Sequence, residues 1–213
     1  MHLSNWLIFC SVALLVTFTP GPAVLMAISN SVSVGPRRAM ISSLGNAAGL
    51  FLVSAVAMAG MGVVLATSAV AFTALKLGGA AYLVYLGIRQ WRSKVSLFSE
   101  MASTQAPASA GADWRLFGHG MTVALTNPKG ILFFSALFPQ FLTREAPVLT
   151  QFFVLTGTFA CCAVLAHAVY VLLGRALKQQ FASASRVRLF NRISGGLFVA
   201  LGFSLLSLRN KAV

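Results

Sequence analysis

Thr126-Asn127-Pro128-Lys129 interrupts a long hydrophobic run in the second half of the chain, and Thr19-Pro20-Gly21-Pro22 interrupts another in the first half. A proline inside a membrane helix removes one backbone hydrogen bond and blocks another, so it persists where neighbours, water or a ligand satisfy the freed carbonyls. Broken helices at matching positions of two halves are typical of the binding site of a secondary transporter. The two interruptions therefore predict a transport protein.

The composition predicts an all-α integral membrane protein. Hydrophobic residues make up 58% of the 213-residue chain and charged residues 9%, and the mean hydropathy is +0.84. Crossing about 30 Å of hydrocarbon takes roughly 20 apolar residues, and six runs approach that length. The expected spans are about Leu3 to Ile28, Met40 to Ala66, Phe72 to Gly87, Leu116 to Leu142, Pro147 to Gly174 and Leu189 to Leu208.

Most of the basic residues fall in alternate loops. Eleven of the sixteen Lys and Arg residues share one side of the expected membrane, which the positive-inside rule identifies as the cytoplasm. Both termini are then predicted to be periplasmic. The net charge of +13 is what span ends and anionic lipid headgroups require, so nucleic acid is not an expected partner. The eleven residues are Arg37, Arg38, Arg89, Arg92, Lys94, Arg115, Arg175, Lys178, Arg186, Arg188 and Arg192.

A stretch rich in Ala and Ser divides the six spans into two groups of three. Residues 103–111 read STQAPASAG, which is typical of a flexible linker. We therefore predict a first three-helix half over residues 1–92, a cytoplasmic linker over 93–115 and a second three-helix half over 116–213. An odd number of spans in each half gives the halves opposite polarity, so they form inverted repeats with helices 1 and 4 broken at proline. Thr19 and Thr126, each followed within two residues by a proline, support the repeat, but short Gly- and Pro-containing matches also arise by chance in membrane chains of low complexity.

Lys129 is the charged residue expected deepest within a span. A lysine at that depth costs about 2.5 to 3.5 kcal/mol on insertion scales, so it should face a cavity. After a break at Pro128, the free N–H groups and Lys129 would bind a carboxylate, while freed carbonyls around Phe18 and Thr19 would bind an ammonium group. Alternatively, the span begins near Pro128 and Lys129 marks its cytoplasmic edge. Asn127 is equally suited to cap the half-helix that follows the break. The predicted substrate-binding residues are Thr19, Pro20, Gly21, Pro22, Asn127, Pro128 and Lys129.

Several glycines predict close helix packing. Gly45 and Gly49 form a small-xxx-small pair, and such pairs let membrane helices approach closely. Glycine-rich faces also permit a homodimer. The same packing role is expected for Gly60, Gly62, Gly78, Gly79, Gly195 and Gly196.

Over nearly its whole length, the chain resembles the LysE/RhtB amino-acid exporters of bacteria. The motifs that carry the resemblance are Pro20-Gly21-Pro22, Gly45 with Gly49, LKLGGAAYLVYLGIRQWR from Leu75 to Arg92, and LTNPKGILFFSALFPQF from Leu125 to Phe141. Within the family, it is most similar to the homoserine and homoserine lactone efflux branch, which includes threonine exporters. The resemblance implies proton-coupled export of a neutral amino acid or derivative across the bacterial inner membrane.

Proton coupling usually requires a buried titratable group, yet Glu100, Asp113 and Glu145 are the only carboxylates and all lie in expected loops or span ends. Exporters that the chain resembles often carry an acid in the fifth span, where this chain has Ala163. His167 lies one helical turn away. It is a candidate proton carrier because imidazole gains its charge near pH 6.5, or it is bonded to a neighbouring helix.

Two other classes of protein remain as alternatives. Adjacent Cys161 and Cys162 raise the possibility of a membrane thiol-disulfide carrier, but they lack the C-x-x-C spacing and Cys10 has no obvious partner. The sequence shows no metal-ligand cluster, nucleophile-base pair or phosphate loop, so we expect no enzyme, cofactor or metal. A passive amino-acid channel is favoured only by the missing membrane carboxylate.

Overall fold

The computed structural model describes residues 3–19, 21–67, 69–92, 113–142, 146–174 and 184–207. Within these ranges the secondary structure is helical and contains no strand, which confirms the all-α prediction. Most of the predicted linker lies outside the described residues. The helices are α1 (Leu3–Phe18), α2 (Pro22–Ser33), α3 (Pro36–Thr67), α4 (Ala69–Arg92), α6 (Asp113–Thr126), α7 (Pro128–Leu132), the π-helix η1 (Phe133–Leu137), the 3₁₀ helix η2 (Phe138–Phe141), α8 (Val148–Leu172) and α10 (Ala184–Ser207).

By length and hydropathy, two helices of the described chain qualify as membrane spans. They are α3 over Pro36–Ala59 and α8 over Val148–Leu172. The pair α1 and α2, bent by 54° at its break, makes a third if it is one span. Among the described residues, the helices of the remaining expected spans are not both long enough and apolar enough to qualify, so the six-span layout stays a prediction.

Apolar side chains on the outer faces of the helices agree with a lipid environment. Leu7 and Ile8 of α1 are 50% and 52% exposed, and Phe153 and Leu165 of α8 are 57% and 54% exposed. Proteins in water rarely expose continuous apolar surface of this kind. Lipid tails solvate it without penalty.

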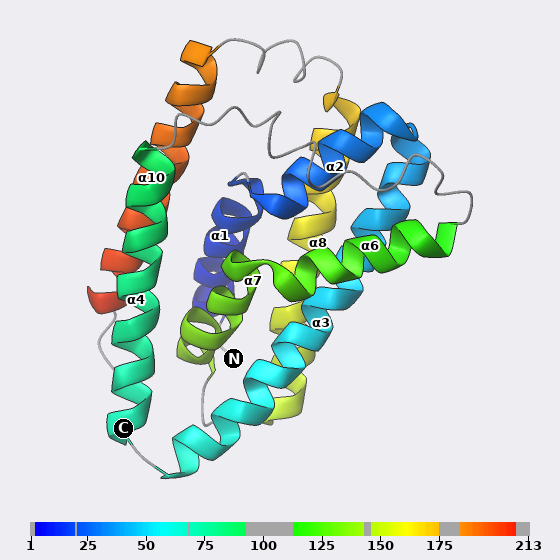
Figure 1. The fold of residues 1–213 in the computed structure, drawn as a ribbon. Helices are drawn as coiled ribbons and strands as arrows, with labels where there is room; N and C mark the ends of the chain where they lie inside the picture. Colours follow the sequence, from blue (N-terminus) through cyan, green and yellow to red (C-terminus); the bar gives the residue numbers. More distant parts are fainter. Residues whose placement is uncertain are drawn as a thin grey trace.

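Two close pairings organise the helices, as Figure 1 shows: α4 packs along α10 at one edge, and α6 crosses α3. Gly45 and Gly49 of α3 lie against the backbone of α6, and Gly195 of α10 lies against the backbone of α4. The predicted packing role is confirmed for these three glycines. It is wrong for Gly78, because a Cβ there would meet no heavy atom of the described residues within 4 Å. The face of α4 that contacts α10 is marked by Gly87 instead.

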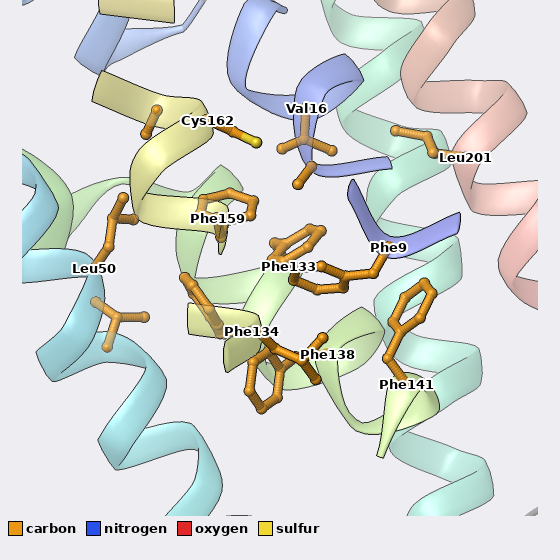
Figure 2. Packing of buried hydrophobic residues seen from close by; sticks show 14 of the residues in the cluster. Phe9, Val16, Leu50, Phe133, Phe134, Phe138, Phe141, Phe159, Cys162 and Leu201 are labelled. Atoms are coloured by element: carbon orange, nitrogen blue, oxygen red, sulfur yellow. The ribbon is translucent and has the colours of Figure 1, made fainter. Parts of the chain in front are cut away.

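An aromatic cluster holds the segment after the second break in the interior (Figure 2). Phe133, Phe134 and Phe138 are at most 1% exposed. Phe133 lies 5.8 Å from the ring of Phe9 in α1 and 4.3 Å from the ring of Phe159 in α8. Aromatic contacts of this kind add to the packing energy, so η1 is fixed between α1 and α8. This arrangement brings α7, directly before η1, to the end of α1.

Candidate functional site

Both predicted interruptions are breaks between helices. The first helix ends at Phe18 and α2 begins at Pro22, with Gly21 as an extended N-cap. In the second half α6 ends at Thr126 and α7 begins at Pro128. A proline in the first turn of a helix loses no intrahelical hydrogen bond, which explains why each second segment starts there. Pro20 lies outside the described residues.

Asn127 is the cap of the second break. Its backbone is extended, its side chain is 5% exposed, and its side-chain oxygen accepts a hydrogen bond of 3.1 Å from the backbone N–H of Lys129. The backbone N–H of Asn127 donates to the carbonyl of Ala124, which Pro128 deprives of its usual donor. The alternative role as a helix cap is therefore observed.

The first break frees carbonyl groups at fixed positions. In an α-helix each carbonyl accepts from the N–H four residues later, but residues 20 and 22 are prolines and have no N–H. The carbonyls of Val16 and Phe18 therefore need other donors. The last regular bond of the helix runs from the N–H of Thr19 to Leu15 over 3.0 Å.

Lys129 and Tyr170 supply those donors. The Lys129 ammonium donates to the carbonyls of Val16 and Thr19 over 2.9 and 2.6 Å. The Tyr170 hydroxyl, on α8, donates to the carbonyl of Phe18 over 2.7 Å. The carbonyls of Phe18 and Thr19, expected to receive a substrate ammonium, thus have protein donors in this structure.

The surroundings of Lys129 contain no ion-pair partner among the described residues. Its half-buried side chain reaches inward from α7 to the end of α1, and Gly21 lies so close that an added Cβ would be 3.4 Å from the ammonium. An ion pair away from this break joins Arg38 and Asp113 over 3.1 Å at an exposed position. Within the described ranges, the positive charge of Lys129 is therefore balanced by the dipoles of the Val16 and Thr19 carbonyls.

His167 lies on α8 close to the same break. Its side chain is 2% exposed, and its Nδ1 has no hydrogen-bond partner among the described residues. Lys129 is near enough for its charge to act on the imidazole. Ala163, one turn earlier, is also buried. The alternative of a histidine bonded to a neighbouring helix finds no support at Nδ1.

A cavity of about 290 Å³ opens beside the first break, between α1 and α10. Its walls share Phe18 and Thr19 with the break and contain no charged side chain. Buried Ser194 adds a second hydroxyl to that of Thr19. The complete lining is Leu14, Leu15, Phe18, Thr19, Ile193, Ser194 and Leu197.

The sequence interpretation missed Tyr170, Ser194 and the neighbour of Cys10. The two prolines signal that the carbonyls of Val16 and Phe18 need donors, but not which residue provides them. Cys10 of α1 packs against the core cluster that contains Cys162 of α8. The cysteines in the described ranges form no disulfide, and those ranges hold no group of three or more residues suited to a metal ion.

Two half-helix ends that meet at a half-buried cation, in an apolar helical chain, are typical of a membrane transport protein. The chain belongs to the LysE type translocator family, which it matches over residues 14–209. It is therefore a translocator and not an enzyme, and the resemblance seen in its motifs is confirmed.

Three relatives cover almost the whole chain. It is 32% identical over 206 residues to a homoserine/homoserine lactone efflux protein of Salmonella typhi, covering 96% of this chain and 97% of the relative. It is 32% identical over 205 residues to an uncharacterized membrane protein of Vibrio cholerae, covering 96% and 98%. It is 28% identical over 200 residues to a leucine efflux protein of Salmonella choleraesuis, covering 93% and 92%. No solved structure matches the chain.

Proposed function

We propose that this protein exports a neutral amino acid or a derivative, such as homoserine, homoserine lactone or threonine, across the bacterial inner membrane by proton antiport. The observation that carries the proposal is the ammonium of Lys129 bound to carbonyls that a broken helix leaves without their usual donors. Similar proteins are named for efflux of homoserine, homoserine lactone and leucine. The LysE family assignment supports transport itself.

The proposed architecture is six spans in two inverted three-helix repeats, with both termini in the periplasm. Pro22 and Pro128 each start a second half-helix. In the proposed repeat, α1 corresponds to α6, α3 to α8 and α4 to α10. The observed contact of α3 with α6 then corresponds to the observed contact of α8 with α1, and the pairings of α3 with α8 and of α4 with α10 each correspond to themselves. This contact pattern supports the repeat.

The proposed substrate site lies between the two breaks and uses the seven residues predicted from the sequence. Thr19, with Pro20, Gly21 and Pro22, forms the carbonyl-bearing side, and Asn127, Pro128 and Lys129 form the N-terminal side of the opposite half-helix. An amino acid needs a partner for each of its two charges. Carbonyl oxygens suit the ammonium group, and a lysine suits the carboxylate.

The lining of the cavity supports a neutral substrate side chain. The cavity adjoins the carbonyl-bearing side through Phe18 and Thr19, and its lining has no charged group. A charged side chain placed there would lose its hydration without gaining a partner. The Thr19 hydroxyl donates to the carbonyl of Leu15 over 2.6 Å and is left as an acceptor, and the Ser194 hydroxyl is a second polar group for a hydroxyl-bearing side chain.

His167 is the proposed proton carrier. The described part of the membrane segments contains no carboxylate, Lys129 lies near this imidazole, and Tyr170 follows three residues later on the same helix. The buried Nδ1 has a free position for a proton or an acceptor. Histidine changes charge within the physiological pH range, which a proton carrier requires.

The proposed partners are the substrate and the lipid bilayer, without nucleic acid. A homodimer is permitted by small residues that the fold leaves unused, such as Gly78 and Gly157, which have no heavy atom within 4 Å of an added Cβ.

The test is efflux from cells loaded with radiolabelled homoserine, threonine or leucine, with and without this protein. Faster efflux that collapses when a protonophore is added is the expected result. Faster efflux that survives the protonophore indicates the alternative, a passive channel. If none of the three amino acids leaves the cells faster, the proposed substrate class is wrong.

A further inference from the structure

Lys129 occupies the place that the ammonium group of a substrate would take. We propose that a bound substrate displaces it: the substrate ammonium replaces Nζ at the carbonyls of Val16 and Thr19, and the displaced Lys129 pairs with the substrate carboxylate. This inference rests on the proposed function and narrows the substrate class. Only a zwitterion with a free carboxylate completes the exchange, whereas a lactone, ester or amide does not.

The carbonyl pair suits either ammonium group but not both at once. The two acceptors hold a single nitrogen, at 2.9 Å from the Val16 oxygen and 2.6 Å from the Thr19 oxygen. A lysine ammonium and the ammonium of an amino acid have the same three N–H donors. The lysine therefore imitates the substrate ammonium and keeps these carbonyls hydrogen-bonded.

Charge balance decides which ligands can take its place. After displacement, Lys129 is still a cation close to the break, and the described residues offer it no carboxylate. The polar groups that face the break from α8 are His167 and Tyr170, and neither carries a negative charge in its ordinary neutral form. The substrate carboxylate is then the anion available for Lys129. A ligand with an ammonium group alone would leave two cations side by side.

Gly21 leaves room for the substrate ammonium to displace Lys129. It lies directly against the end of the Lys129 side chain, and it has no side chain of its own on that path. The lysine stem is flexible, so a small displacement of Nζ opens the carbonyls without moving the helices. The cavity beside Phe18 and Thr19 then lies next to the incoming ammonium group.

The test compares ligands that differ only in the carboxylate. Purified protein in proteoliposomes exchanges radiolabelled leucine or homoserine, with unlabelled leucine, leucinamide, homoserine or homoserine lactone as competitors. We expect leucinamide and homoserine lactone to compete roughly 100-fold more weakly than the matching acids, the range for losing one partner of a buried charge pair. Equal competition by acid and amide in the wild-type protein overturns the inference.

A second variant separates the lysine from the rest of the site. Lys129→Gln keeps an N–H donor for the carbonyls but removes the charge, and Lys129→Arg keeps a cation. The thermal midpoint of each purified variant, measured with leucine or leucinamide, reports binding even where transport is lost. We expect Lys129→Gln to respond equally to the two ligands and Lys129→Arg to prefer leucine.

Retained preference for leucine in Lys129→Gln contradicts the inference. If the protein transports amino acids but leucine and leucinamide compete equally well, this inference is wrong and the proposed function stands. Absence of exchange with any amino acid overturns the proposed function and the inference together.

Discussion

Replacing Gly120 with alanine tests the crossing of α3 and α6 that positions the second break. A Cβ at Gly120 would fall on the backbone carbonyl of Ser42 and would lie 3.0 Å from the backbone nitrogen of Asn46. Both contacts are with backbone, so the helices must separate. Overpacking of this kind costs about 1 to 3 kcal/mol. Separation also weakens the 3.3 Å hydrogen bond from the Asn46 side chain to the Gly120 carbonyl.

Such interhelical bonds average about 0.6 kcal/mol in membranes, and alanine in place of glycine returns about 0.5 to 1 kcal/mol of helix propensity, so the expected net loss in the free energy of unfolding is roughly 1 to 3 kcal/mol. Gly118→Ala is the matched control, because it lies on the same helix and its added Cβ would meet no heavy atom within 4 Å. Alanine stabilises a helix interior by about 0.5 to 1 kcal/mol relative to glycine, so this variant should be as stable as the wild type or slightly more stable.

Unfolding of both purified variants in SDS, followed by circular dichroism, gives the two free energies. Wild-type stability of Gly120→Ala would refute the crossing geometry. Equal destabilisation by the two variants would show that contact with α3 is not the cause, since an added Cβ touches α3 at Gly120 and not at Gly118.

His167→Ala should make the rate of export independent of pH between about pH 5.5 and 7.5, because the proposed carrier is lost; an unchanged pH profile of efflux would return His167 to a structural role. Tyr170→Phe leaves the Phe18 carbonyl without its donor and should lower the free energy of unfolding by about 1 to 2 kcal/mol, and wild-type stability in the same SDS titration would contradict this. Ser54 and Thr156 share a buried 2.7 Å hydrogen bond between α3 and α8, so Ser54→Ala and Thr156→Val should show a coupling of about 0.6 kcal/mol in a double-mutant cycle, whereas additive effects would deny the bond any energy.

The helix breaks could be predicted from the sequence because they depend on local chemistry. Pro20 and Pro22 remove the donors for two defined carbonyls, and Pro128 does the same in the second half. The identity of the replacement donors could not be predicted. Lys129 is 113 residues from Val16, and Tyr170 is 152 residues from Phe18, so both contacts depend on how distant helices pack.

The glycines show the same limit. Gly45 and Gly49 were predicted correctly because their spacing places both on one face of a helix. Gly78 was not, because spacing within α4 does not say which face meets α10. That face is chosen by the close contact between Gly87 and Gly195, which lie in opposite halves of the chain.

The central claim is that a neutral amino acid binds where Lys129 meets the broken end of α1. Exchange of radiolabelled homoserine, threonine or leucine by purified protein in proteoliposomes tests it most directly, with Lys129→Ala as the variant. Proteoliposomes with the wild type should take up at least one of the three labelled amino acids. Proteoliposomes with Lys129→Ala should take up none, although the variant still inserts and folds. Normal exchange by Lys129→Ala, or no exchange by the wild type, would contradict the account.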